Sequence, residues 1–470
     1  MNRYETLDLP KAHKISHPPF CSFFGYYDKC PWDETNRYLL GHRVDRTSTP
    51  TDHGSVVTVG HYDLEDGNHF TPLAETTSWN WQQGAMLQWL ETSPTDKVLF
   101  NRATDCGYQT VVCDLKNGHE RTVDKPLVAA SPRGDFILSY DFSRLAVTHP
   151  TIGYFTHPIA RNLEKQPSDD GLFCVDLRSG EESLILSYAA AASLQPLPSM
   201  NSAIHWFTHA AVNPTGTRIL FLHRWTKRVE DENQWFHRLI TANPDGSSIA
   251  ILQTSEHPAP SGDEGSDWTY AYEENANQIS HPVWVGADHI LAWSTRGERS
   301  RYHLYTDRSS DVEEIGGDTL RQNGHFTISP NKKWLLSDTY PDPSNSCRSL
   351  FLFHLTERRT VPLGDFFSDP HLAKEARCDL HPRWRRDGKE LYYYSPADSM
   401  IMAVSGASPS VNASGISIAT PLAGPRPGSA PIRVTAAASR APLGGSRSAQ
   451  IGSRPSPLLL PPRNWCRGRR

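Results

Sequence analysis

Four histidines occupy the same position relative to four of seven similar turns in the sequence. In each case the residue lies four positions before the turn begins. The four are His209, His281, His325 and His381, and a fifth turn has Tyr26 at this position. The other two turns have Trp89 and Leu127 there. Equivalent positions in repeated units occupy equivalent places in the fold, so we expect these imidazoles to face a common axis.

Imidazoles that converge on one point favour metal chemistry. Neutral imidazole nitrogens, together with an amide oxygen, are suitable ligands for a borderline divalent ion such as manganese, zinc or iron. Amide side chains that we expect beside the histidines are Gln82, Gln83, Gln322 and Asn323. The sequence therefore predicts a divalent metal site as one possibility, and hydrogen-bonded structural histidines as the other.

A second set of polar residues ends the strand that follows each turn. Its members are His42, Arg43, Asn101, Arg102, Tyr140, Asp141, His223, Arg224, Ser294, Arg296 and Asp338. Because adjacent antiparallel strands bring the end of one beside the start of the next, both sets should line one polar bowl. Guanidinium groups bind carboxylates or sulfates through paired hydrogen bonds. A metal and an arginine on a sugar carboxylate would acidify the neighbouring carbon, and a His or Tyr base could then start a β-elimination.

Each of these patterns also has a structural interpretation. His42, His205 and His223 could pack against nearby aromatic rings, and a His-Arg pair at a strand end is often a solvated rim. The tryptophans near Trp81, with Gln83, could form a carbohydrate platform or the core between two repeats.

The elements that must position these residues are short strands. The seven turns begin at Cys30, Ser93, Ser131, Asn213, Val285, Ser329 and Arg385. An apolar run follows each turn, and six units continue into a second strand-turn-strand pattern. Two hairpins per unit make one four-stranded blade. The sequence therefore predicts an all-β fold, a seven-bladed β-propeller with four-stranded antiparallel blades.

The seventh unit is incomplete in the sequence. After Tyr394 the chain becomes rich in Ser, Ala, Pro, Gly and Arg, a composition typical of disorder. We expect an N-terminal extension at 1–19, the propeller at 20–399 and a disordered tail at 400–470. Either N-terminal residues supply strands that close the ring, or the C-terminus is an aberrant ending.

Composition limits the partners of the protein. Its 470 residues carry a formal net charge of -5, so there is no overall positive field for nucleic acid or an anionic membrane. The eight cysteines form no CxxC pair, which favours reduced thiols. There is no signal-peptide pattern and no run of 18 apolar residues. We expect a cytoplasmic protein, with a monomer favoured.

Residues 20 to 395 resemble the oligogalacturonate-lyase-like and TolB-like group of WD40-like β-propellers. The resemblance is carried by His209 with Asn213-Pro214, by His223, by His281 and by Gln322-Asn323-Gly324-His325. It implies a bound manganese ion, with zinc as the alternative, held by Gln322, His325 and His281, and it implies His223 as the base. Where the family has a further ligand histidine, this chain has Thr327, and His209 or His381 could substitute for it.

These patterns lead to one hypothesis and one alternative. The hypothesis is a metal-assisted lyase that cleaves a uronate-containing oligosaccharide. Its metal ligands would be His209, His281, Gln322, His325 and His381. Its catalytic residues would be His223, Arg224, Arg102 and Tyr26, and its substrate-binding residues Arg43, Gln83 and Trp81. The alternative is a non-catalytic propeller that binds a protein or a glycan on the same face.

Overall fold

The computed structural model describes residues 12–45, 50–157, 163–230, 235–255, 278–297, 299–372, 374–395 and 400–405. All of them belong to one compact unit, Met1–Ala419. The predicted tail from residue 406 onward lies outside the described residues.

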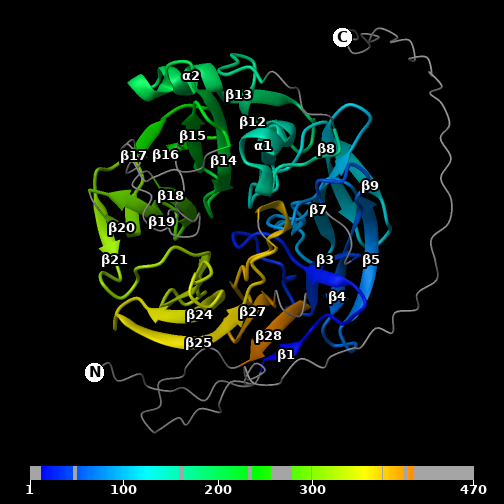
Figure 1. Ribbon diagram of the computed structural model, residues 1–470. Coiled ribbons are helices and arrows are strands. Elements are labelled where there is room, and N and C mark those ends of the chain that lie inside the picture. The colour runs from blue at the N-terminus through cyan, green and yellow to red at the C-terminus, as the bar shows by residue number, and fades with distance from the viewer. Residues whose placement is uncertain are drawn as a thin grey trace, which may run out of the picture. The chain divides into compact units, whose positions relative to one another are not determined.

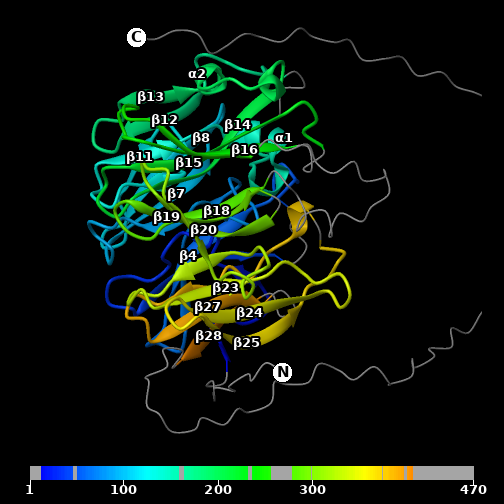
Figure 2. The same ribbon diagram turned by 90° about the vertical axis from the view of Figure 1, so that its left-hand side faces the viewer.

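Within this unit the described strands form seven four-stranded antiparallel sheets, arranged as blades around a central axis (Figures 1 and 2). In the first six blades the strands pair in chain order, from the innermost strand outward. The predicted all-β, seven-bladed propeller is confirmed.

The strands of the first three blades are β2 (Cys21–Phe23), β3 (Tyr38–Val44), β4 (Val57–Asp63), β5 (His69–Thr76), β6 (Gln88–Trp89), β7 (Lys97–Ala103), β8 (Tyr108–Asp114), β9 (Glu120–Val123), β10 (Ala129–Ala130), β11 (Phe136–Ser139), β12 (Gly171–Asp176) and β13 (Glu182–Ser187). Those of the next three are β14 (Ile204–Val212), β15 (Ile219–Thr226), β16 (Phe236–Ala242), β17 (Ala250–Ser255), β18 (Ile279–Trp284), β19 (His289–Arg296), β20 (Arg299–Thr306), β21 (Val312–Ile315), β22 (Phe326–Ile328), β23 (Trp334–Asp338), β24 (Cys347–His354) and β25 (Arg359–Phe367). The seventh blade contains β26 (Arg383–Trp384), β27 (Glu390–Ser395), β28 (Met400–Ser405) and β1 (His13–Lys14).

The N-terminal segment completes the seventh blade. Strand β1 pairs with β28, and the backbone N–H of Ile15 donates to the carbonyl of Ile401 at 2.9 Å. Ile15 and Ile401 are buried in the same apolar cluster. Of the two sequence-based explanations, N-terminal closure of the ring is the one observed. One strand of this blade, β1, lies before residue 20, and another, β28, lies after residue 399.

The inner hairpins follow the predicted turns, with a shift in register in each of the first two blades. In the first blade the backbone N–H of Asp33 donates to the carbonyl of Tyr38. The turn there begins at Asp33 rather than Cys30, and Lys29 rather than Tyr26 takes the position equivalent to His209. In the second blade the backbone N–H of Leu90 donates to the carbonyl of Lys97, as that of Asn213 donates to Arg218 in the fourth. The turn therefore begins at Leu90 rather than Ser93, and Met86 rather than Trp89 takes the position equivalent to His209. Trp89 is buried in β6, where its indole N–H donates to the carbonyl of Pro31.

Apolar side chains of neighbouring blades form the core between them. Leu220 and Leu222 of β15, for example, share one buried cluster with Ile290 and Ala292 of β19. Burying such side chains stabilises the fold by roughly 1.5–3 kcal/mol each. The blades are thereby fixed to one another around the axis.

Helices are few and short. They are α1 (Phe142–Thr148), η1 (Pro150–Ile152), α2 (Tyr188–Ser193), η2 (Pro198–Met200) and η4 (Lys374–Ala376). The Asp141 side chain caps α1 by accepting from the N–H of Ser143, and η1 contacts η4. In the described part of the chain, no helix has both the length and the apolar character needed to span a membrane.

Candidate metal centre

Local backbone geometry turns the histidines out of their strands. His209 lies in β14 and His281 in β18, each at a break in strand register and each with a positive φ, 56° and 51°. His381, just before β26, has a φ of 42°. A residue other than glycine seldom adopts this conformation, and β-bulges often re-aim side chains beside active sites.

The imidazoles meet at one buried place, as predicted. The ring centroids of His281 and His325 lie 4.2 Å apart, and those of His325 and His381 lie 4.3 Å apart. His209 lies 5.9 Å from His281 by the same measure. These residues come from the fourth, fifth, sixth and seventh blades, so the site exists only in the closed ring.

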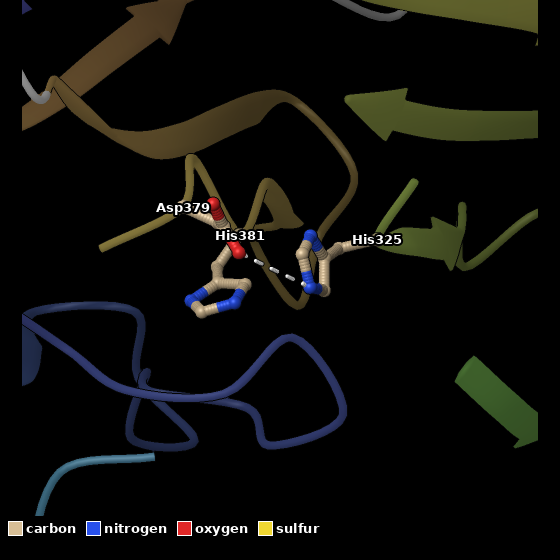
Figure 3. A group of neighbouring side chains, drawn as sticks. All are labelled: His325, Asp379 and His381. Carbon is tan, nitrogen blue, oxygen red and sulfur yellow. Dashed lines mark ion pairs between the residues drawn. The ribbon is translucent and has the colours of Figure 1, made fainter. Parts of the chain in front are cut away.

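Asp379 joins two of these histidines in a set with metal-ligand geometry (Figure 3). One ligand atom each from His325, Asp379 and His381 can be chosen so that all lie within 4.8 Å of one another. His325 Nε2 is 3.7 Å from Asp379 Oδ2. His381 Nε2 is buried and has no hydrogen-bond partner among the described residues. An unpartnered imidazole nitrogen beside a carboxylate fits a divalent cation, so a possible His/Asp metal site is present.

Burial favours the neutral imidazole of His209, His281 and His381, because it lowers the pKa of each. It holds the pKa of His281 well below its ordinary value, and the nearby His325 lowers it further. The pKa of His381 is lowered for the same two reasons. That of His209 is lowered first by burial and then by the charge of Arg224. Neutral imidazoles have a lone pair for a metal.

The carboxylate of Asp379 is kept ionised by arginines. Burial alone would raise its pKa, but Arg348 and Arg377 hold the pKa well below the usual range. Arg348 forms a close ion pair with Asp379 Oδ1, and Arg377 Nε lies 3.2 Å from Oδ2. The acidic ligand is therefore available as an anion although it is fully buried.

Tyr26 reaches the cluster from the first blade. Its hydroxyl is 2.7 Å from His209 Nε2, and its ring lies 5.2 Å from that of His381. The loop that carries Tyr26 is held by Arg383, which donates to the carbonyl oxygens of Gly25, Tyr26 and His381. The phenol and the imidazole of His209 form a pair that can pass a proton.

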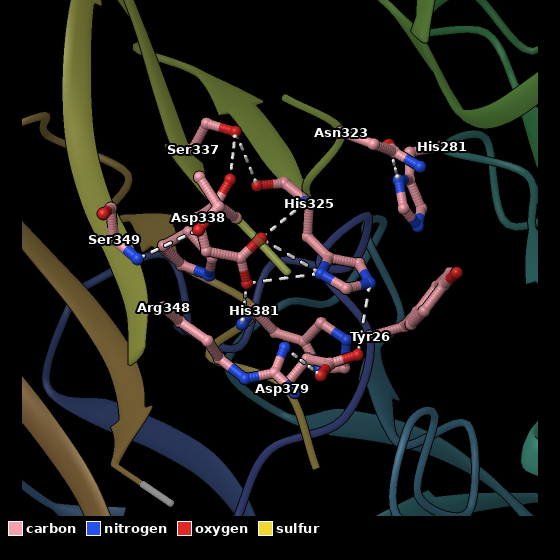
Figure 4. A network of polar contacts seen from close by, with 12 residues as sticks. Tyr26, His281, Asn323, His325, Ser337, Asp338, Arg348, Ser349, Asp379 and His381 are labelled. Carbon is pink, nitrogen blue, oxygen red and sulfur yellow. Dashed lines mark hydrogen bonds and ion pairs between the residues drawn. The ribbon is translucent and has the colours of Figure 1, made fainter. Parts of the chain in front are cut away.

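Two further acceptors orient the ring nitrogens (Figure 4). Asn323 Oδ1 lies 3.2 Å from His281 Nδ1. Asp338 Oδ1 lies 3.1 Å from His325 Nδ1. With Nδ1 occupied in this way, the Nε2 atom of each ring is left for another partner.

Positive groups lie beside the cluster. Arg224 is buried and its guanidinium is 3.0 Å from Nδ1 of His149, a partly exposed residue next to η1. The charge of Arg224 also lowers the pKa of His209 and of His281. Arg377 stacks over the partly exposed ring of Tyr340 at 5.2 Å. These guanidiniums suit an anionic group that approaches the cluster.

On the other side of Tyr27 the channel contains a cavity of about 450 Å³, lined by residues from all seven blades. The ring of Tyr27 also lies 5.4 Å from His281 and 5.6 Å from His325. Tyr27 therefore stands between the imidazoles and this cavity.

Comparisons with known proteins bear on the fold. No protein-family model matches the sequence, and no curated protein matches it. Among solved structures, oligogalacturonate lyase from Vibrio parahaemolyticus is similar, with a TM-score of 0.57 and 14% identity over 86% of this chain and 96% of that one. An oligogalacturonate lyase in complex with manganese gives 0.57 and 13% over the same shares. TolB from Acinetobacter baumannii gives 0.34 and 13%, over 78% of this chain and 80% of that one.

The propeller fold is shared with the two oligogalacturonate lyases. At such identities the likeness shows the fold and leaves the activity to be argued from the site.

The predicted metal ligands mostly meet in the structure. His281, His325 and His381 lie together, and His209 adjoins them through Tyr26. Gln322 is exposed, and the amide that faces His281 belongs to the next residue, Asn323.

His223 and two of the predicted arginines lie elsewhere. Among the described residues, the side chain of His223 contacts His205, Phe207 and Trp225, in a separate buried group. The two arginines contact other residues. Arg102 forms a half-exposed ion pair with Glu120 at 2.7 Å, and Arg43 stacks on Phe70 at 4.1 Å.

Trp81 and Gln83 are buried, which does not suit a sugar platform. Trp81 packs against Trp79 at 5.3 Å and Phe23 at 4.9 Å, so it belongs to the core between blades. The backbone N–H of Gln83 donates to Asn80 Oδ1 in a tight turn.

Asp379 and Asp338 are the principal site residues that the sequence pattern undervalued. Asp379 belongs to neither of the two residue sets counted from the turns, and Asp338 was placed only as one of many strand-end residues. Arg348 and Arg377 carried no sequence signal, because they lie outside the repeated strand ends.

Proposed function

We propose that the protein is a metal-assisted lyase that cleaves a uronate-containing oligosaccharide by β-elimination. One observation carries the proposal: imidazoles from separate blades converge with the buried carboxylate of Asp379, beside the guanidiniums of Arg224 and Arg377. The fold likeness to an oligogalacturonate lyase in complex with manganese supports the same reaction class.

His325, His381 and Asp379 would hold the metal, with His281 beside them. This set of nitrogen and oxygen donors suits Mn²⁺, and Zn²⁺ is the second candidate. When bound, such a cation would withdraw charge from the substrate carboxylate and make the adjoining C–H more acidic.

The chain's own groups would bind the substrate and move its protons. Arg224 and Arg377 would bind the uronate carboxylate. Tyr26, in its hydrogen bond with His209, would take the proton from the carbon next to the carboxylate. As Tyr26 passes its own hydroxyl proton to His209, the electron pair of that C–H bond forms the C=C bond and the bond to the leaving oxygen breaks. That oxygen then takes the proton held by His209. We assign the base to this pair rather than to His223, because His223 lies in a different buried group.

The experiment compares two arginines that the sequence pattern treats alike. The purified protein is incubated with oligogalacturonate and Mn²⁺, and the ultraviolet absorbance of the unsaturated product is followed. We expect Arg224→Ala to reduce kcat/KM by at least about 30-fold, as removal of a buried charged partner does. Arg102→Ala should stay within about twofold, because its pair with Glu120 is solvated.

Absence of unsaturated product from every uronate glycan tried, with Mn²⁺ or Zn²⁺ added, would contradict the lyase. The alternative, a propeller that only binds its ligand, is favoured by the burial of the cluster, in which the most exposed histidine is 7% accessible. Under that alternative the same glycans bind but are recovered intact.

A further inference from the structure

We infer that Asp338 is a positioning residue, which fixes His325 in the Nδ1–H tautomer and holds His381 beside it. This inference rests on the proposed function in one respect only, that Nε2 of His325 serves a metal ion. Asp338 ends β23 in the sixth blade, His325 precedes β22 of the same blade, and His381 belongs to the seventh.

Three N–H groups converge on the carboxylate of Asp338 (Figure 4). Oδ1 accepts from the backbone N–H of His325 at 2.6 Å, and Nδ1 of the same residue lies 3.1 Å from Oδ1 and 3.2 Å from Oδ2. Oδ2 also accepts from the backbone N–H of His381 at 3.2 Å. One fully buried side chain therefore joins two proposed ligands from adjacent blades.

The chemistry of these groups decides the tautomer. An ionised carboxylate has only acceptors, so Nδ1 of His325 must carry a hydrogen to bond with it. In a neutral imidazole, Nε2 then has the lone pair. That lone pair faces Asp379 Oδ2 at 3.7 Å. Two acceptors that face each other across such a gap repel unless a proton or a metal cation lies between them, and the cation is the proposed metal.

The backbone around Asp338 is shaped for this contact. A Cβ on Gly324 would lie 1.8 Å from the carbonyl oxygen of Asp338, so only glycine allows the two segments to come this close. Ser337 Oγ donates to the carbonyl of His325 at 3.3 Å. His381, whose N–H bonds to Asp338, has a φ of 42°, and this bond helps to hold its left-handed backbone.

Asn323 provides an internal comparison. It accepts from Nδ1 of His281, but at 3.2 Å it offers one neutral oxygen to one ring. Asp338 offers two charged oxygens to three donors. Hydrogen bonds to a charged acceptor are roughly twice as strong as neutral ones, so Asp338 should have the larger effect on the metal.

The test uses the full-length protein with Asp338→Asn. In the metal-free wild type at pH 8, nitrogen NMR of ¹⁵N-labelled histidine should show His325 as the Nδ1–H tautomer. In the variant a single amide oxygen cannot serve all three donors, and we expect a mixture of tautomers. Calorimetric titration with Mn²⁺ should give a 10- to 100-fold weaker affinity, the range known for such outer partners of a ligand.

Asp307→Asn is the matched control. Asp307 is also a buried carboxylate, paired with Arg218 at 2.7 Å and bonded to Thr241, but in the fifth blade and apart from the cluster. Its replacement should destabilise the fold and leave the Mn²⁺ affinity within about twofold. Such a result would separate positioning from general loss of stability.

An Nε2–H tautomer for His325 in the wild type would overturn the inference, and so would a variant with unchanged tautomer and unchanged affinity. If Asp338→Asn does not fold, the tautomer of His325 in the wild type alone tests the inference. A wild type that eliminates no uronate glycan, yet shows the expected tautomer and affinity change, refutes the lyase and leaves the role of Asp338 standing.

Discussion

Two groups of buried histidines occur in this propeller, and only one of them has the geometry of a site. His205 and His223 lie in regular register on β14 and β15, with Nδ1 of the first 2.8 Å from Nε2 of the second and their rings stacked. His281 and His381 have left-handed backbones, and His381 lies beside the carboxylate of Asp379. Burial lowers the pKa in both groups.

The difference lies in the backbone and in charge. A regular strand directs its side chains to the two faces of the sheet, where neighbouring blades cover them. A bulge with a positive φ at His209 or His281 instead directs the ring toward the axis. In the described part of the chain, no carboxylate contacts His205 or His223, whereas Asp338 and Asp379 both lie against His325. Burial of a histidine alone therefore does not mark a site.

The two histidine groups should differ most in metal binding. We expect His325→Ala to weaken Mn²⁺ binding by at least about 100-fold, more than loss of an outer partner would. His223→Ala should keep stoichiometric metal. Elemental analysis of the dialysed, metal-loaded proteins measures both. Equal metal in the two variants, each folded by circular dichroism, would mean that the central cluster is not the metal site.

The next largest difference should be in how much each group contributes to the free energy of unfolding. In the metal-free protein, Asp379→Asn leaves Arg348 buried without its anion, which we expect to cost about 3 to 5 kcal/mol. His223→Gln removes one neutral hydrogen bond and should cost about 1 to 2 kcal/mol. Urea unfolding gives both free energies. A smaller loss for Asp379→Asn than for His223→Gln would show that the charges of the cluster are not buried as described.

Acid should destabilise the fold in part through the pair of His205 and His223. Burial lowers the pKa of His205 to about 4, whereas the unfolded chain takes up this proton below about pH 6.5. The contribution of His205 to the free energy of unfolding is therefore fully present above pH 6.5. It is lost as the pH falls toward 4, by up to about 3 kcal/mol. His205→Gln should reduce the slope of unfolding free energy against pH between 7 and 4.5. It should not abolish it, because burial also lowers the pKa of His209, His281 and His381.

The exposed His69 offers the control for this measurement. His69→Gln should leave the slope as it is in the wild type. If His205→Gln also leaves it unchanged, the acid sensitivity arises outside the pair.

The fold could be predicted because its signal is repeated. Each blade repeats a turn followed by an apolar strand, so seven weak local patterns supported one architecture. The closing strand could be predicted only as one of two alternatives, because His13 and Lys14 carry no strand pattern of their own and gain their partner, β28, only from the ring.

The sequence predicted those residues of the candidate site whose place is fixed by their distance from a turn. Counting back from the turns found His209, His281, His325 and His381, since equivalent positions meet at the axis. His223 and Arg102 were chosen from strand ends, where the direction of a side chain depends on blade packing that the sequence does not reveal. Asp338 and Asp379 were undervalued because their importance comes from donors on other blades.

The pairing of β1 with β28 also has a consequence for biosynthesis. Ile401 donates to the side chain of Ser16 across 385 positions of sequence. Contacts of such long separation slow folding, and the ribosome makes the N-terminal partner first. Strand β1, which is synthesised first, therefore cannot pair with β28 until nearly every blade has been synthesised. The proposed metal ligands of the last two blades, His325, Asp379 and His381, come together at the same late stage.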